Sequence, residues 1–149
     1  MPLVSFRRLM EDAERGSYAV GYFESWNLES LQGVIGAAED EKSPVIVGFN
    51  GIELPDPRRV AAERLELYAA LGLAACEQTS SPAALLFNES PHPAWVERAI
   101  ELGFNVVMFS DDHLPPYELR NQVRRTVEIA RGRAAVEAEM EAVPGLAGG

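Results

Sequence analysis

Residues 82–90 read PAALLFNES, and this stretch decides the fold. Its residues 83–87 form an apolar run without a polar break, and serine and proline stand on both sides of the stretch. A short apolar run bounded in this way is typical of a strand buried on both faces, and such strands belong to parallel sheets covered by helices. In these sheets functional side chains follow the carboxyl ends of the strands. Asn88 and Glu89 are therefore predicted to lie at a site.

Helical and strand patterns alternate along the rest of the chain, with short connections between them. The predicted strands are 18–23, 45–49, 82–90, 105–109 and 133–140. Four of the predicted helices are 6–15, 28–41, 93–102 and 116–131. A fifth begins at Asp56 and Pro57 and ends at Gly72, and a short helical piece after it reaches Gln78. This alternation indicates right-handed parallel βαβ units. Two architectures fit it: an open doubly wound sheet or part of a (β/α)8 barrel.

Length and charge restrict the class of protein. The chain has 149 residues, which suits one domain, and its formal charge of −10 would repel nucleic acid and anionic membrane surfaces. Neither is an expected partner. The first residues contain no apolar stretch of signal-peptide length, and no segment approaches the roughly 20 apolar residues that span a bilayer. The sequence therefore predicts a cytoplasmic protein.

Two residue types that occur once each limit the chemistry. The one cysteine, Cys76, lies in an alanine-rich apolar stretch, so a role in packing is predicted. The one lysine, Lys42, precedes the strand predicted at 45–49, at the end of the sheet away from the expected site. A Schiff-base mechanism needs a lysine amine beside the substrate carbonyl, so this mechanism is not expected.

Polar side chains follow five successive predicted strands. They are Glu24, Asn50, Asn88 with Glu89, Asp111 with Asp112, and Glu139. Each of these taken singly is more commonly a helix cap or a solvent-facing group. Because the carboxyl ends of parallel strands meet at one edge of a sheet, the set as a whole favours a binding site.

Four segments carry a resemblance to a known family. They read YAVGYFESWNLESLQGVIGAAEDEKSPVIV (18–47), SPAALLFNES (81–90), AIELGFNVVMFSDDHLPPYELRNQVRRTVEIA (99–130) and VEAEM (136–140). In this order they resemble the class II, metal-dependent fructose-bisphosphate and tagatose-bisphosphate aldolases. The resemblance implies a (β/α)8 TIM-barrel fold. Because such a barrel takes about 250 residues, residues 1–149 would be the N-terminal portion of a single barrel domain, with about five parallel strands.

The resemblance also implies an activity and a cofactor. The activity is metal-assisted, reversible aldol cleavage of a phosphorylated ketose. Glu89 stands where the family has a zinc-binding histidine, and Glu139 matches a glutamate of a second metal position. These two are the expected metal ligands. The divalent ion is zinc in the family, and Mg²⁺ or Mn²⁺ would suit the oxygen ligands present here. Glu24 and Asn50 are expected to contact the substrate.

The catalytic positions depart from the family pattern. Asn88 stands where the family has the aspartate that transfers the proton, and an amide cannot transfer one. Asn88 is therefore expected to orient the substrate, with Asp111 or Asp112 as the replacement proton carrier.

The same departure leaves other functions open. The principal alternative is a non-catalytic sugar-phosphate-binding homologue, or a half-barrel that serves as an assembly module. An open-sheet domain unrelated to the aldolases is a third possibility. The expected partners are a small phosphorylated sugar and further copies of the chain in a homo-oligomer, because a partial barrel exposes sheet edges.

Overall fold

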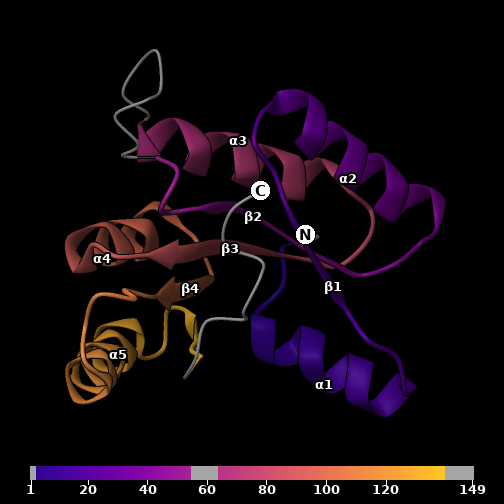
Figure 1. Cartoon of the computed structure of the whole chain (residues 1–149). Helices are drawn as coiled ribbons and strands as arrows, with labels where there is room; N and C mark the ends of the chain where they lie inside the picture. Colours follow the sequence, from indigo (N-terminus) through magenta and orange to yellow (C-terminus); the bar gives the residue numbers. More distant parts are fainter. Residues whose placement is uncertain (1–2, 55–63, 140–149) are drawn as a thin grey trace.

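In the part of the chain that the structure describes, five parallel strands form one sheet and alternate with five helices. The computed structural model describes residues 3–54 and 64–139. The strands are β1 (Gly21–Glu24), β2 (Val45–Asn50), β3 (Ala83–Ser90), β4 (Val106–Phe109) and β5 (Ala135–Glu137). The helices are α1 (Phe6–Gly16), α2 (Leu28–Asp40), α3 (Leu65–Gln78), α4 (Pro93–Leu102) and α5 (Pro116–Ala130). The strands lie side by side in sequence order (Figure 1).

The strand order decides between the two architectures that fit the sequence. An open doubly wound sheet reverses its strand order at a switch point, whereas a (β/α) barrel adds each strand next to the one before it. Here each strand pairs in parallel with its successor, and α2–α5 follow the outer side of the sheet while α1 lies on the other side (Figure 1). The predicted partial barrel is therefore confirmed.

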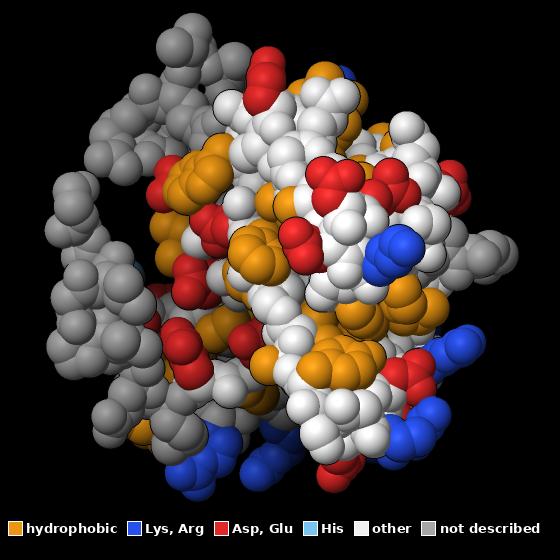
Figure 2. Space-filling model, turned by 90° about the vertical axis from the view of Figure 1, so that its right-hand side faces the viewer, with side chains coloured by type: hydrophobic (Ala, Val, Ile, Leu, Met, Phe, Trp, Pro, Cys, Tyr) orange, Lys and Arg blue, Asp and Glu red, His pale blue; other side chains and the backbone are white. Residues whose placement is uncertain are grey.

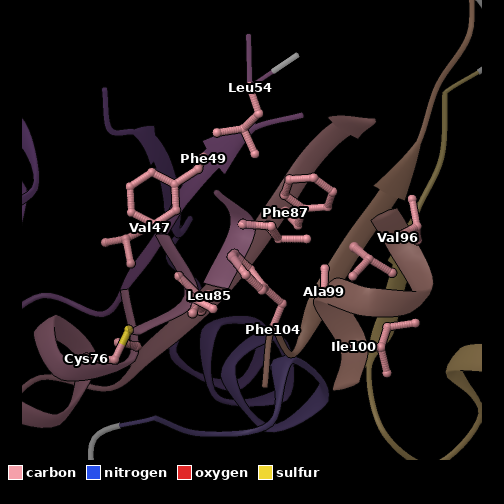
Figure 3. Packing of buried hydrophobic residues seen from close by; sticks show 14 of the residues in the cluster. Val47, Phe49, Leu54, Cys76, Leu85, Phe87, Val96, Ala99, Ile100 and Phe104 are labelled. Atoms are coloured by element: carbon pink, nitrogen blue, oxygen red, sulfur yellow. The ribbon is translucent and has the colours of Figure 1, made fainter. Parts of the chain in front are cut away.

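The main core lies between the sheet and helices α2–α5. Val47 and Phe49 of β2 and Leu85 and Phe87 of β3 point into it (Figure 3). Cys76 of α3 joins this core with no exposed surface, and burial raises the pKa of its thiol to about 12. The predicted packing role of Cys76 is thus confirmed, because a thiol with so high a pKa is not a nucleophile near neutral pH.

The opposite side of the sheet is called here the inner face. The alternation of side chains along each strand, together with the strand register, places the following residues on this face: Tyr22, Glu24, Ile46, Gly48, Asn50, Ala84, Leu86, Asn88, Val106, Met108, Ala135 and Glu137. Its amino-terminal half is apolar and packs against Leu9 of α1. Its carboxyl-terminal half carries polar side chains, so the inner face divides into a packed end and a polar end.

Within the described residues, β1 is an edge strand that pairs only with β2. Phe23 of β1 is 52% exposed, and Trp26 after it is 51% exposed. Figure 2 shows the side of the molecule on which α1 and α2 lie, with hydrophobic side chains exposed between acidic ones. A groove of about 610 Å³ lies between α2 and β1, with Phe23, Val34 and Pro44 in its lining.

No helix in the described part of the chain is long and apolar enough to cross a bilayer.

Local signals set the helix ends where the sequence places them. Asn27 caps α2 through its side chain, which accepts a hydrogen bond from the Ser30 amide at 2.8 Å, while the Ser30 hydroxyl accepts one from the Asn27 amide at 3.1 Å. Gly103 ends α4 with a φ of 104°, a conformation that glycine adopts without strain. Lys42 lies in the turn before β2, at the amino end of the sheet, as predicted.

Three predicted boundaries were wrong, and a fourth falls outside the described residues. β1 begins at Gly21 rather than Tyr18, because its partner β2 begins only at Val45, which pairs with Gly21. β5 covers three residues rather than eight, because it pairs only with residues 106–108 of β4. Gly72 does not end α3, which continues to Gln78. The helix start predicted at Asp56 and Pro57 lies outside the described residues.

The continuation of α3 through Gly72 has a packing reason. A Cβ atom at Gly72 would lie 2.6 Å from a methyl carbon of Leu85, so the missing side chain lets α3 approach the sheet closely. A glycine inside a helical pattern predicts a helix end from local preference alone. Here the contact between α3 and β3 decides instead.

Candidate functional site

A bulge near the carboxyl end of β3 turns two consecutive side chains toward the site. Phe87 pairs with Val107 and Ser90 with Phe109, so Asn88 and Glu89 together oppose one residue of β4. Glu89 has a φ of 49°, in the left-handed region that non-glycine residues rarely adopt. In a regular strand Glu89 would point away from Asn88. The bulge instead brings its carboxylate to the same group of side chains.

Asn50 joins two carboxylates from different strands. Its side-chain amide donates to Glu89 Oε2 at 2.8 Å and to Glu24 Oε2 at 3.2 Å. The amide cannot turn freely, because its Oδ1 accepts a hydrogen bond from the backbone amide of Ile52 at 2.8 Å. The NH₂ group is therefore held toward the carboxylates, and Asn50 acts as a neutral bridge between β1 and β3.

Glu24 is the most connected member of the group. Tyr22 donates to its Oε2 at 3.2 Å, and Asn50 and Asn88 also form side-chain hydrogen bonds with this carboxylate. Asn88 itself is buried, with 8% of its surface exposed. We call Glu24, Asn50, Asn88 and Glu89 the strand-end cluster. The sequence prediction that these four side chains lie together at the carboxyl ends of the strands is confirmed.

Desolvation changes the acidity of the groups on the polar half of the inner face. Burial raises the pKa of Glu24 above its ordinary value; the hydrogen bonds from Asn50, Tyr22 and Asn88 oppose this shift, and the charge of Glu89 adds to it. Burial, followed by the neighbouring Glu24 carboxylate, raises the pKa of Tyr22 far above its ordinary value. At neutral pH the Tyr22 phenol therefore keeps its proton and acts as a donor.

The other predicted site residues lie outside this hydrogen-bonded group. Asp111 is half-buried in the loop after β4, where its carboxylate accepts a hydrogen bond from the His113 amide at 3.0 Å. Asp112 is exposed in the same loop, and Glu139 is exposed after β5. The catalytic role predicted for Asp111 or Asp112 and the metal-binding role predicted for Glu139 stay predictions.

Two residues of the inner face were not predicted as site residues. Tyr22 precedes Glu24 by two residues in β1, so strand alternation places both on one face, and Glu137 ends β5 two residues before Glu139, which follows the strand. Burial, followed by the charges of Glu139 and Glu89, raises the pKa of Glu137. More than a third of Glu137 is exposed, so solvent screens much of this effect. The period of two in each strand was the signal that could have identified both residues.

The described residues do not fit a catalytic zinc site on their own. Such a site takes three protein ligands. Within residues 3–54 and 64–139, no group of three or more histidine, cysteine, aspartate and glutamate side chains is arranged to hold a metal ion. Between the two carboxylates of the strand-end cluster stands the NH₂ group of Asn50, a donor that cannot ligate a cation. The predicted pair Glu89 and Glu139 is thus not a complete ligand set.

The fold and the cluster define an α/β protein of the barrel type with a polar site at the carboxyl ends of its strands. The chain belongs to the class II fructose-bisphosphate aldolase family, whose model matches residues 4–149. This result confirms the resemblance found in the sequence.

The similar proteins are about twice as long as this chain. The fructose-bisphosphate aldolase of Geobacillus stearothermophilus is 34% identical over 146 residues, which cover 97% of this chain and 50% of the relative. The fructose-bisphosphate aldolase of Staphylococcus aureus (strain N315) is 30% identical over the same shares. The chain therefore spans about half the length of the curated relatives it matches.

A solved aldolase structure shares the fold of this chain. The crystal structure of the YdjI aldolase from Escherichia coli K12 aligns with a TM-score of 0.73 and 24% identity. This alignment covers 86% of this chain and 47% of that chain.

Proposed function

We propose that the chain is the N-terminal portion of a single (β/α) barrel domain of a ketose-bisphosphate aldolase-like protein. Its strand-end cluster binds the carbonyl- and hydroxyl-bearing carbons of a phosphorylated ketose, and the reaction is reversible aldol cleavage. Class II aldolases in general act on phosphorylated sugars and depend on a metal ion. The observation that carries the proposal is the hydrogen-bonded group of Glu24, Asn50 and Glu89, drawn from three neighbouring strand ends of a family member.

The chemistry of the cluster suits the hydroxyl groups of a sugar. Carboxylate oxygens accept hydrogen bonds from hydroxyl groups, and side-chain amides both donate and accept. The cluster contains two carboxylates and no cation, so it would repel a phosphate group. The phosphates of the ketose are therefore expected to lie away from β1–β3, with the uncharged carbons of the sugar facing the cluster.

Binding is the first test. Titration calorimetry with fructose 1,6-bisphosphate and tagatose 1,6-bisphosphate is expected to show binding to the full-length protein, and Asn50→Ala is expected to weaken it about tenfold, the worth of a hydrogen bond of roughly 1.4 kcal/mol. Asn121→Ala, the same change at an exposed position of α5, is the matched control and should leave the affinity unchanged. Equal affinities of the Asn50 and Asn121 variants would contradict the assignment of the site.

Cleavage is the second test, and it separates the two functions that the sequence leaves open. NMR of the same mixtures, with and without added Zn²⁺, Mg²⁺ or Mn²⁺, reports formation of the aldehyde and ketone products. The buried Asn88, which cannot transfer a proton, favours the non-catalytic sugar-phosphate-binding alternative. Binding without products would establish that alternative, and products would establish the aldolase.

A further inference from the structure

Aldol cleavage requires a group that accepts a proton from a hydroxyl and returns a proton to carbon. Asn50 and Asn88 cannot perform this step, because an amide neither gains nor loses a proton at ordinary pH. Tyr22 holds its own proton, since burial and the Glu24 carboxylate raise its pKa far above the ordinary range. Within the strand-end cluster only the carboxyl groups of Glu24 and Glu89 remain.

The contacts of these two carboxyl groups differ. Glu24 lies on a regular strand and takes hydrogen bonds from Tyr22, Asn50 and Asn88, which come from three strands and hold one orientation of its side chain. Glu89 lies on the bulge, where its carboxylate accepts a hydrogen bond from Asn50 at 2.8 Å. Glu24 is also hydrogen-bonded to Asn88, the residue that stands where the family pattern has its proton-transferring aspartate.

The surroundings of Glu24 favour proton transfer over mere charge stabilisation. The groups that face it are Tyr22 on its own strand, Asn50 on β2, and Asn88 and Glu89 on β3; Glu137 on β5 contributes a charge on the same inner face. None of these is a cation that would hold Glu24 permanently ionised. Desolvation raises the pKa of Glu24 above its ordinary value, which makes its carboxylate a stronger base.

We propose that Glu24 transfers the proton in this protein, an inference that rests on the aldol cleavage proposed above. Glu24 takes the proton of the C4 hydroxyl, and the C4–O bond becomes the carbonyl of the aldehyde as the C3–C4 bond breaks. The electron pair of that bond forms a C2=C3 double bond and places a negative charge on the C2 oxygen. Glu24 then returns the proton to C3, which restores the C2 carbonyl of the ketone product.

Steady-state kinetics of the full-length protein test this assignment. Glu24→Gln keeps an acceptor oxygen but cannot carry a proton, so kcat is expected to fall by about 10²- to 10⁴-fold, while the calorimetric Kd for the ketose bisphosphate stays within about threefold. Glu24→Asp keeps the carboxyl group and is expected to retain measurable turnover. Glu97→Gln, an exposed change on α4, is the control for the loss of one charge and should leave kcat unchanged.

The outcomes separate this inference from the proposed function. A wild-type protein that binds the ketose bisphosphate without cleaving it overturns the aldolase and the role of Glu24 together. A wild-type protein that cleaves, with a Glu24→Gln variant of unchanged kcat, overturns only the role of Glu24. In the latter case a loss of kcat in Asp111→Asn or Asp112→Asn would move the proton transfer to the loop after β4.

Discussion

Glu89 adopts a left-handed backbone conformation at the bulge of β3, and its carboxylate meets the amide of Asn50 there. For a residue with a side chain this conformation costs about 1–2 kcal/mol. Backbone strain of this kind persists where the surrounding structure imposes it, and it is common at functional sites. The bulge is therefore best understood as the device that brings consecutive residues to one site.

Substitutions at Glu89 measure this strain. Both Glu89→Gly and Glu89→Ala remove the hydrogen bond to Asn50, but only glycine relieves the left-handed backbone. Glu89→Gly is therefore expected to be more stable than Glu89→Ala by about 1 kcal/mol in urea unfolding. At the exposed helical position Glu97 the order should reverse, with glycine about 1 kcal/mol less stable than alanine. The same order at both positions would contradict the strained conformation.

Among the elements, α1 closes the apolar half of the inner face. Its Leu9 is 1% exposed and packs with Ile46, Leu86 and Val106. Asn105 ties the segment before the helix to the sheet, because its side chain donates to the Val4 carbonyl at 2.6 Å and accepts from the Leu85 amide at 2.8 Å. The helix is thus an integral part of the fold rather than a loose extension.

Truncation of Leu9 tests this role of α1. Leu9→Ala is expected to lower the free energy of unfolding by about 2–4 kcal/mol, because it leaves a cavity between the helix and the sheet. Met10→Ala, at the next residue and 40% exposed, should change it by less than about 0.5 kcal/mol. Equal effects in chemical denaturation would show that α1 does not pack on the inner face in solution.

Strand β2 requires a glycine beside the cluster. A Cβ atom at Gly48 would lie 2.1 Å from the carbonyl oxygen of Leu86, a backbone atom of the neighbouring strand. Gly48→Ala is therefore expected to destabilise the protein by about 1–3 kcal/mol. Gly36 of α2 has open space around it, so Gly36→Ala should stabilise by roughly 0.5–1 kcal/mol through helix propensity. Thermal unfolding of the two variants measures both changes in stability. A Gly48→Ala protein as stable as the wild type would refute the close approach of Gly48 to the Leu86 carbonyl.

For the molecule as a whole, the acids of the inner face make stability depend on pH. The pKa of Glu24 is raised in the folded state, so between its ordinary value of 4.5 and its folded value the folded protein binds more protons than the unfolded chain. Stability is then greatest below that range and falls as pH rises through it. The gain in unfolding free energy from Glu24→Gln should accordingly be larger at about pH 8 than at about pH 4.5. A gain that is independent of pH in urea titrations would contradict the desolvation of Glu24.

The open edges of the sheet govern association. In the described part of the chain β1 and β5 each pair on one side only, and Phe23 of β1 is 52% exposed. Unpaired strand edges template association, so the 149-residue chain expressed alone is expected to self-associate in light scattering. Phe23→Lys places a charge on the edge strand and should shift the association equilibrium toward the monomer. Leu67→Lys, at an exposed position of α3, should leave this equilibrium unchanged. A monodisperse monomer would refute the predicted homo-oligomer.

The sequence by itself determined the order of helices and strands, the buried strand at residues 83–90 and the family, because these follow from hydrophobic periodicity, local capping and long stretches of similar sequence. It also placed Glu24, Asn50, Asn88 and Glu89 at the carboxyl ends of the strands, since parallel strands end at a common edge.

Only the tertiary structure decided which polar side chains meet. The bulge that turns Glu89 beside Asn88, the Asn50 amide that joins Glu24 to Glu89, and the desolvation of Glu24 arise from contacts between strands. Residues distant in sequence make those contacts, so local pattern carries no signal for them. The course of α3 through Gly72 has the same origin, because the packing of the helix on β3 outweighs the preference of glycine for a helix end.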